Sequence, residues 1–328
     1  MIDPLRRVAL IVLCSFLVTV PIPAQRKGPI EEQNIRAELG FLASDAMQGR
    51  GSGTIYERIA AEYIGSQFRQ FGLEPGGDTD ADGNKSYVQR VPLNSGVVPT
   101  GEQRATWNAI GVLRGTEPGE AIMLSAHLDH LGVNESLKDD KIFNGADDDA
   151  SGCVAVLELA RVLASGKRPR RTIYFICFGS EERGGYGSRA FIANPPVPLP
   201  QIVADLTFEM LGRPDAKVPP GTLWLTGYER STLGPELARQ GAALVADPRP
   251  DQHFFQRSDN YPLALRGVVA HTVSSFGLHN DYHRVSDEIS KIDFPFMTRS
   301  LNSLVKPVEW FANSSFRPAW LPGQAPTR

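Results

Sequence analysis

The chain has 328 residues, of which 41% are hydrophobic, 22% charged and 9% aromatic, and its formal net charge is −3. This composition excludes a collagen-like protein, a coiled coil and a mostly disordered chain. No run of Lys and Arg stands out, so nothing in the sequence indicates a nucleic-acid partner. The length suffices for one large domain or two of ordinary size, with a sizeable buried core.

The N-terminal residues have the features of a secretory signal. Arg6 and Arg7 precede the apolar stretch 8–20, which is shorter than the roughly 20 residues that span a bilayer. Ala24 then offers a small residue for cleavage. We therefore expect residues 1–24 to be a signal peptide and the protein to be exported, periplasmic or extracellular, with no stable membrane partner after cleavage. An uncleaved N-terminal anchor is the alternative.

Hydrophobic periodicity then predicts an α/β protein. Residues 35–43 and 56–71 have helical spacing, and Gly72 is well placed to end the second helix. Apolar runs predict four buried strands, with helical stretches such as 151–164 between several of them; the runs are 121–126, 172–179, 202–208 and 267–274. This alternation predicts a three-layer α/β/α sandwich with a mixed, mainly parallel sheet, followed by an irregular tail over residues 318–328.

Residues able to bind metal or transfer protons follow each predicted strand. They are His127, Asp129 and His130; Asp147, Asp148 and Asp149; Glu181 and Glu182; Glu209; and His279, Asp281 and His283. Sites in open α/β sheets form outside the carboxyl ends of the strands, so we expect these side chains to converge. Taken singly, an Asp run or a Glu pair is usually solvated surface. Together at strand ends, imidazoles and carboxylates favour zinc or a similar divalent ion.

The charges of such residues can balance two ions. Two divalent ions bring four positive charges. Three carboxylates offset three of these, two neutral histidines offset none, and a hydroxide would neutralise the one positive charge that remains. A bridging carboxylate holds such ions about 3.5–4 Å apart in hydrolytic two-metal sites. Other chemistries have less support, because the sequence has no G-x-S-x-G elbow and no Walker A loop, and Cys153 lies on an apolar helix face.

An ordered set of motifs resembles the secreted zinc aminopeptidases of metallopeptidase family M28, leucyl aminopeptidase type. The likeness covers nearly the whole chain after residue 25. The motifs include SAHLDHLG at 125–132, GADDDASG at 145–152, GSEE at 179–182, EMLGR at 209–213, Ser258-Asp259 and Asp281-Tyr-His283. The resemblance implies a zinc-exopeptidase-like fold in a single domain, residues 25–328, without a protease-associated insert.

The resemblance also implies a role for each matching residue. His127 and Glu209 would be the terminal ligands of one zinc ion, and Glu182 and His283 those of the other. Asp148 would bridge the two ions. The catalytic residues would be Glu181 as general base, Tyr282 as the group that polarises the scissile carbonyl, and Asp129 as the acid that orients His127. One departure stands out: many members have Asp where this chain has Glu209.

The implied reaction is removal of N-terminal residues from peptides by a two-zinc hydrolase, with Glu181 activating a bridging water. A single-zinc glutaminyl-cyclase-like acyltransferase, a dipeptidase or carboxypeptidase of the same fold, and a non-enzymatic binding module are the alternatives. The sequence leaves open whether Met210, Phe254, Phe255 and Phe276 line a substrate pocket or belong to the core.

Overall fold

The computed structural model describes residues 29–93, 104–117 and 119–327 of the chain. The predicted signal peptide, residues 1–24, therefore lies outside the described residues. Among the helices of the described ranges, none combines the length and apolar character that crossing a membrane requires.

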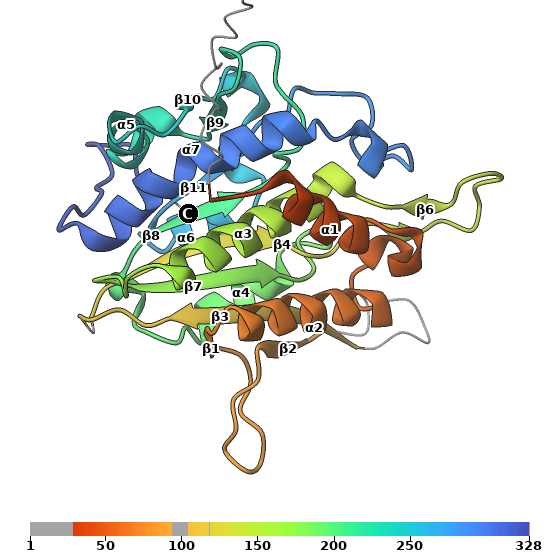
Figure 1. Ribbon diagram of the computed structural model, residues 1–328, viewed down its shortest axis with the longest axis horizontal. Coiled ribbons are helices and arrows are strands. Elements are labelled where there is room, and N and C mark those ends of the chain that lie inside the picture. Colours follow the sequence, from red (N-terminus) through yellow and green to blue (C-terminus); the bar gives the residue numbers. More distant parts are fainter. Residues whose placement is uncertain (1–28, 94–103, 118, 328) are drawn as a thin grey trace, which may run out of the picture.

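A mixed β-sheet forms the centre of the molecule (Figure 1). In the described part of the chain, nine strands pair in the order β1-β3-β7-β4-β8-β11-β9-β10, with β2 paired to β3. Their bounds are β1 Glu74–Pro75, β2 Val88–Pro92, β3 Ala105–Leu113, β4 Ala121–His127, β7 Thr172–Phe178, β8 Ile202–Phe208, β9 Leu223–Leu225, β10 Leu244–Ala246 and β11 Val269–Ser274. A separate hairpin joins β5 Gly132–Val133 to β6 Ile142–Phe143.

The four predicted strands are the four central strands β7, β4, β8 and β11. They pair in parallel with one another, whereas β3 beside β7 and β9 beside β11 run antiparallel. All four are buried along their whole length, which explains their continuous apolar sequences. The predicted mixed, mainly parallel sheet is confirmed.

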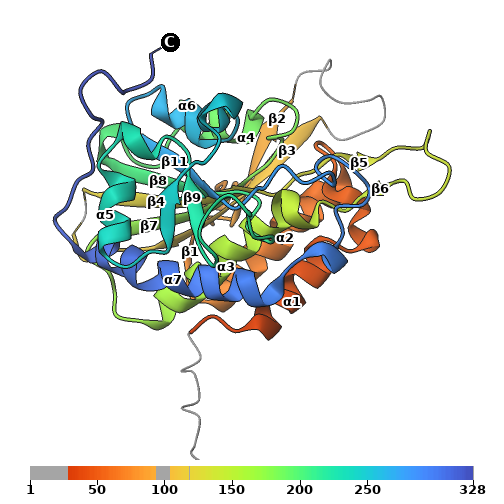
Figure 2. The same cartoon turned by 90° about the horizontal axis from the view of Figure 1, so that it is seen from above.

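Helices cover both faces of the sheet and complete the predicted three layers (Figure 2). Successive strand residues point to opposite faces. In β4, Ile122 and Leu124 pack in the core that includes α1, α2, α3 and α7, while Ala121 and Met123 pack in the core that includes α4 and α6. The helices are α1 Glu32–Leu42, α2 Ile55–Gln70, α3 Gly152–Ser165, α4 Tyr186–Ala193, α5 Leu233–Arg239, α6 Asn260–Ala264 and α7 Phe294–Asn313.

Local signals in the sequence set the limits of α2. Thr54 is the N-cap, and its Oγ1 accepts a hydrogen bond from the Glu57 amide at 3.3 Å. The helix ends at Gln70, and Gly72 adopts the left-handed φ of +79° two residues later, as predicted. The Glu57 carboxylate is fully buried beside this cap and reaches the loop after β7, which carries residues of the site described below.

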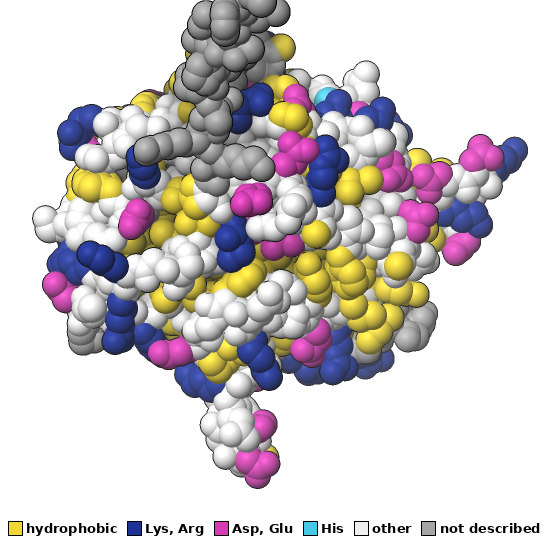
Figure 3. Space-filling model, in the orientation of Figure 1, with side chains coloured by type: hydrophobic (Ala, Val, Ile, Leu, Met, Phe, Trp, Pro, Cys, Tyr) yellow, Lys and Arg dark blue, Asp and Glu magenta, His cyan; other side chains and the backbone are white. Residues whose placement is uncertain are grey.

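The surface of α1 and α2 carries exposed hydrophobic side chains, which gather in one area of the space-filling view (Figure 3). Phe41, Ile55 and Ile59 are exposed there, and the Phe41 ring stacks on Tyr63 with centroids 4.3 Å apart. These residues are separate from those that make up the polar cluster at the strand ends.

Candidate metal centre

The predicted site residues come together at the carboxyl ends of the central strands. His127 is the last residue of β4, Glu181 and Glu182 follow β7 closely, and Glu209 follows β8 directly. Two further residues come from loops: Asp148 lies in the turn Ala146–Ser151 before α3, and His283 lies in the loop after β11. This is the edge at which open α/β sheets form their sites.

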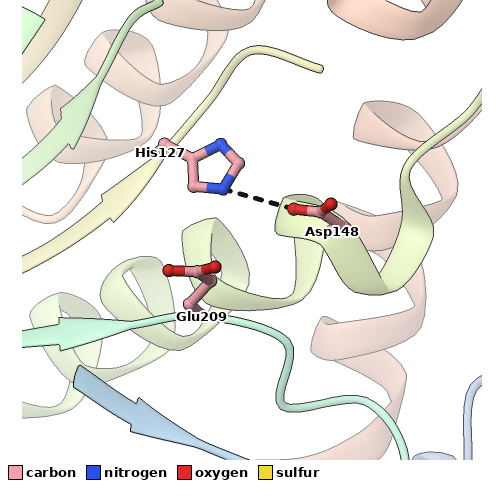
Figure 4. A group of neighbouring side chains, drawn as sticks. All are labelled: His127, Asp148 and Glu209. Carbon is pink, nitrogen blue, oxygen red and sulfur yellow. Dashed lines mark ion pairs between the residues drawn. The ribbon is translucent and has the colours of Figure 1, made fainter. Parts of the chain in front are cut away.

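One cluster consists of His127, Asp148 and Glu209, whose side chains point toward one another (Figure 4). Each offers a ligand atom within 4.8 Å of the others, and His127 Nε2 lies 3.3 Å from Asp148 Oδ1. His127 and Asp148 are buried, and Glu209 Oε2 has no hydrogen-bond partner among the described residues. A buried carboxylate oxygen without a donor is costly, so the cluster fits a cation held between nitrogen and oxygen ligands.

A second cluster surrounds the other oxygen of Asp148. His283 Nε2 lies 3.2 Å from both Asp148 Oδ2 and Glu182 Oε2. His130 is also present, with its Nδ1 2.9 Å from Glu182 Oε1. The arrangement unites two predicted ligands, Glu182 and His283, with the predicted bridging residue. The sequence identifies His130 only as one of the polar residues that follow the first predicted strand.

Asp148 therefore belongs to both clusters, with Oδ1 facing His127 and Oδ2 facing His283. Although burial opposes ionisation, hydrogen bonds from His127 and His283 hold the pKa of the Asp148 carboxyl well below its usual range. Burial also opposes a charge on His283, but hydrogen bonds to Asp148 and Glu182 raise the pKa of that imidazole to about 10. The low pKa favours the ionised carboxylate of Asp148, the form in which an acid binds metal.

Burial raises the pKa of two further carboxyl groups at the site, those of Glu209 and Glu181. Burial raises the pKa of Glu209 to about 7, and nearby Asp148 adds to this effect. Burial likewise raises the pKa of Glu181 well above its usual range, with Glu209 and Asp259 contributing. Such crowding of carboxylates favours cations in the site, because bound divalent ions would offset their mutual repulsion.

Asp129 is buried and holds the loop that carries the two glutamates. Its carboxylate accepts hydrogen bonds from Ser52 Oγ at 2.5 Å, from the Glu181 amide at 2.9 Å and from the Glu182 amide at 3.3 Å. His127 Nδ1 lies 3.1 Å from the Asp129 carbonyl oxygen and 3.8 Å from Oδ1. The nearer partner of the His127 ring is thus the backbone of Asp129, and its carboxylate mainly positions Glu181 and Glu182.

Three non-glycine residues of the site have left-handed backbone conformations. Ser180 precedes Glu181 with φ +55°, Met210 follows Glu209 with φ +55°, and His283 itself has φ +53°. Such conformations cost about 1–3 kcal/mol each and persist where the surroundings determine them. The Ser180 amide, for example, donates to buried Glu57 Oε1 at 3.0 Å. Tertiary contacts thus hold these residues in conformations that are unfavourable by themselves.

Tyr282 lies beside the second cluster, at the edge of a small pocket. Its ring stacks on His283 with centroids 3.9 Å apart, and burial raises the pKa of its hydroxyl. The hydroxyl therefore stays protonated and can donate a hydrogen bond.

Aromatic side chains form much of the wall of this pocket. The lining residues are Glu209, Met210, Trp224, Thr226, Phe254, Arg257, Thr272, Ser274, Phe276 and Tyr282. Three of the four residues that the sequence left undecided thus line the pocket, while Phe255 packs in the core with α6. A larger cavity of about 590 Å³ between α3 and α7 is lined by none of the cluster residues.

Comparison with known proteins places this arrangement in a family. The model of peptidase family M28 matches residues 108–306, more than half of the chain. Leupeptin-inactivating enzyme 1 of Streptomyces exfoliatus is 31% identical over 259 residues, which are 77% of this chain and 50% of that enzyme. The chain spans half or less of the length of the curated relatives it matches.

Solved structures show the same fold. A zinc aminopeptidase from Bacillus subtilis superposes with a TM-score of 0.65 at 17% identity, over 89% of this chain and 98% of that one. The glutaminyl cyclase of Porphyromonas gingivalis superposes with a TM-score of 0.63 at 18% identity, over 86% and 98%. The family match, the fold and the residues gathered at the strand ends lead to one conclusion: the chain belongs to peptidase family M28.

Proposed function

We propose that this protein is a zinc-dependent aminopeptidase that hydrolyses N-terminal peptide bonds with two zinc ions. The observation that carries the proposal is the position of Asp148, whose two oxygens face two different histidines in two clusters. His127, Asp148 and Glu209 would hold one ion, and Asp148, Glu182 and His283 the other. Imidazole and carboxylate ligands at these positions suit zinc.

When bound, zinc would supply Lewis-acid polarisation of the scissile carbonyl and lower the pKa of water. The chain's own residues would do the rest. Glu181 accepts a proton from the attacking water and returns it to the leaving amine, as a general base and then acid. The protonated Tyr282 hydroxyl donates a hydrogen bond to the developing oxyanion. Asp129 keeps Glu181 in place, because its carboxylate accepts a hydrogen bond from the Glu181 backbone amide.

The site's charge and shape support attack at the N-terminal end. The carboxyl groups of Glu209 and Asp259 lie near enough to Glu181 to raise its pKa, so acidic groups gather at this point and would pair with a substrate ammonium group. The pocket beside Glu209 is lined by Trp224 and Phe254, which suits an apolar side chain on the first residue of the substrate.

A glutaminyl-cyclase-like reaction with one zinc ion is less well supported, although such an enzyme shares the fold. The cluster of His127, Asp148 and Glu209 offers a complete ligand set for another ion. We also propose that the enzyme acts on peptides after export and that residues 25–328 form one catalytic domain, as the sequence predicts.

A peptide-library digest with mass-spectrometric readout tests this function. Purified protein should release single residues from the N-terminus, lose activity on treatment with a chelator and regain it when zinc is added. Release from the C-terminus would indicate a carboxypeptidase, and cleavage confined to dipeptides a dipeptidase. Loss of ammonia from N-terminal glutamine without hydrolysis would indicate a cyclase. Any of these three results would contradict the proposal.

A further inference from the structure

His130 is held rigidly beside the second cluster. Its side chain is buried, and its backbone amide donates to the Arg50 carbonyl oxygen at 3.2 Å. The buried Arg50 guanidinium in turn donates to the carbonyl oxygens of Leu128 and Gly145 at 2.9 and 3.0 Å. The ring lies so close to Gly145 that a Cβ at that position would be 2.6 Å from two of its carbons. These contacts hold the backbone at His130 and pack Gly145 against its ring, and the ring nitrogen Nδ1 faces Glu182.

The two histidines of the second cluster contact Glu182 in different ways. His283 Nε2 is equally distant, at 3.2 Å, from Glu182 Oε2 and Asp148 Oδ2. His130 Nδ1 lies on the opposite carboxylate oxygen, Oε1, at 2.9 Å, and is 3.8 Å from Asp148 Oδ2. Ligand atoms that share a zinc ion at about 2.0–2.2 Å lie roughly 3–4 Å apart, and both 3.2 Å distances of His283 fall in this range. His130, Asp148 and Glu182 also offer ligand atoms within 4.8 Å of one another, but His130 Nδ1 is at hydrogen-bond distance from Glu182 and farther than His283 from Asp148 Oδ2.

We propose that His130 is a positioning residue of the second metal site: its Nδ1–H donates to Glu182 Oε1 and thereby turns Oε2 toward Asp148 and His283. The inference rests on the two-ion centre proposed above. A carboxylate ligand that is hydrogen-bonded in this way loses less freedom when it binds a metal. Removing such partners typically costs about 10- to 100-fold in metal affinity.

Two substitutions distinguish the effect of losing the Nδ1 hydrogen bond from the effect of losing the imidazole ring. The amide nitrogen of His130→Asn can occupy the position of Nδ1, whereas that of His130→Gln reaches toward the position of Nε2. Both are polar and close in size, so they form a matched pair. His283→Ala, which removes a ligand nitrogen, is the reference for direct loss of coordination.

The readouts are zinc affinity, measured by competition with a chromophoric chelator, and cadmium NMR of the metal-loaded proteins. We expect His130→Gln to lower the affinity for one of the two zinc ions by about 10- to 100-fold. His130→Asn should stay within a few fold of wild type, and the cadmium shifts of both variants should indicate an unchanged number of nitrogen ligands. Circular dichroism verifies that each variant is folded.

The outcomes distinguish this inference from the function on which it rests. Unchanged affinity in His130→Gln would show that the Nδ1 contact does not position the ligand. Equal losses in both variants, with cadmium shifts like that of His283→Ala, would make His130 a direct ligand and overturn the positioning role. Wild-type protein that binds a single zinc ion would instead contradict the two-ion centre.

Discussion

Replacing Glu181 by Gln should abolish most of the turnover while leaving the metal centre intact. The loop around Glu181 is held by backbone amides: Glu181 donates to Asp129, and Ser180 donates to Glu57 at 3.0 Å. None of these contacts uses the Glu181 carboxylate. Gln keeps the size of the side chain and removes its basicity, so the loop and the adjacent predicted ligand Glu182 should stay in place.

The expected loss follows from the role proposed for the Glu181 carboxylate, that of general base. General acid–base catalysis contributes about 10²- to 10⁴-fold in rate. At about 1.36 kcal/mol per tenfold change, this corresponds to roughly 3–5 kcal/mol of transition-state stabilisation. Burial raises the pKa of Glu181, and a base whose pKa lies nearer to the operating pH is the more effective one. We therefore expect kcat to fall by at least about 100-fold, with little change in KM.

The assay is steady-state hydrolysis of an aminoacyl-anilide beside zinc analysis of the same samples. Glu182→Gln should behave differently, because this carboxylate contacts His130 and His283, so zinc content should fall with activity. Exposed Arg183 supplies the control, and Arg183→Gln should leave both quantities unchanged. Near-normal kcat in Glu181→Gln with both ions bound would refute the assignment of Glu181 as the base.

Three further predictions concern the bridge, the oxyanion and a buried histidine. Asp148→Ala should lose both zinc ions, because each cluster loses a ligand; full zinc content by elemental analysis would exclude a bridging role. Tyr282→Phe should lower kcat more than it raises KM, since the role proposed for its hydroxyl is in the transition state; an unchanged kcat would remove that role. Burial lowers the pKa of His271 to about 4 in the folded state. Below about pH 6.5 the unfolded state therefore binds a proton on this imidazole that the folded state does not bind. Stability should therefore fall as the pH drops, by about 2 kcal/mol between pH 7 and pH 5 from this group alone. His271→Gln should lack this component in urea titrations at the two pH values, and an identical pH dependence in both proteins would contradict the assignment.

Sequence patterns predicted the centre of the fold because the central strands are buried on both faces. The continuous apolar runs of β4, β7, β8 and β11 follow directly from this burial. The pattern did not reveal β3, although it too is almost wholly buried. Its sequence includes Thr106 and Asn108, whose side chains bond to Glu57 and to the Gly179 amide. Partners so distant along the chain cannot be inferred from local polarity.

The convergence of these polar residues was predicted from the sequence, but their geometry was not. Strand ends identified the residues that converge, and the family resemblance suggested their roles. The position of His130 against Glu182 depends on the Arg50 and Gly145 contacts, which join segments far apart in sequence. The left-handed conformations of Ser180 and Met210 likewise depend on tertiary hydrogen bonds. Asp205, four residues before Glu209, is buried in β8, where its carboxylate accepts hydrogen bonds from Ser125 and Thr207.

The most direct test of the two-zinc peptidase is a zinc titration of the metal-free protein, with bound zinc and the release of N-terminal residues followed together. The account predicts that zinc binding saturates at two ions per chain and that full peptidase activity requires both. Saturation at one ion per chain, or two bound ions without release of N-terminal residues, would contradict it.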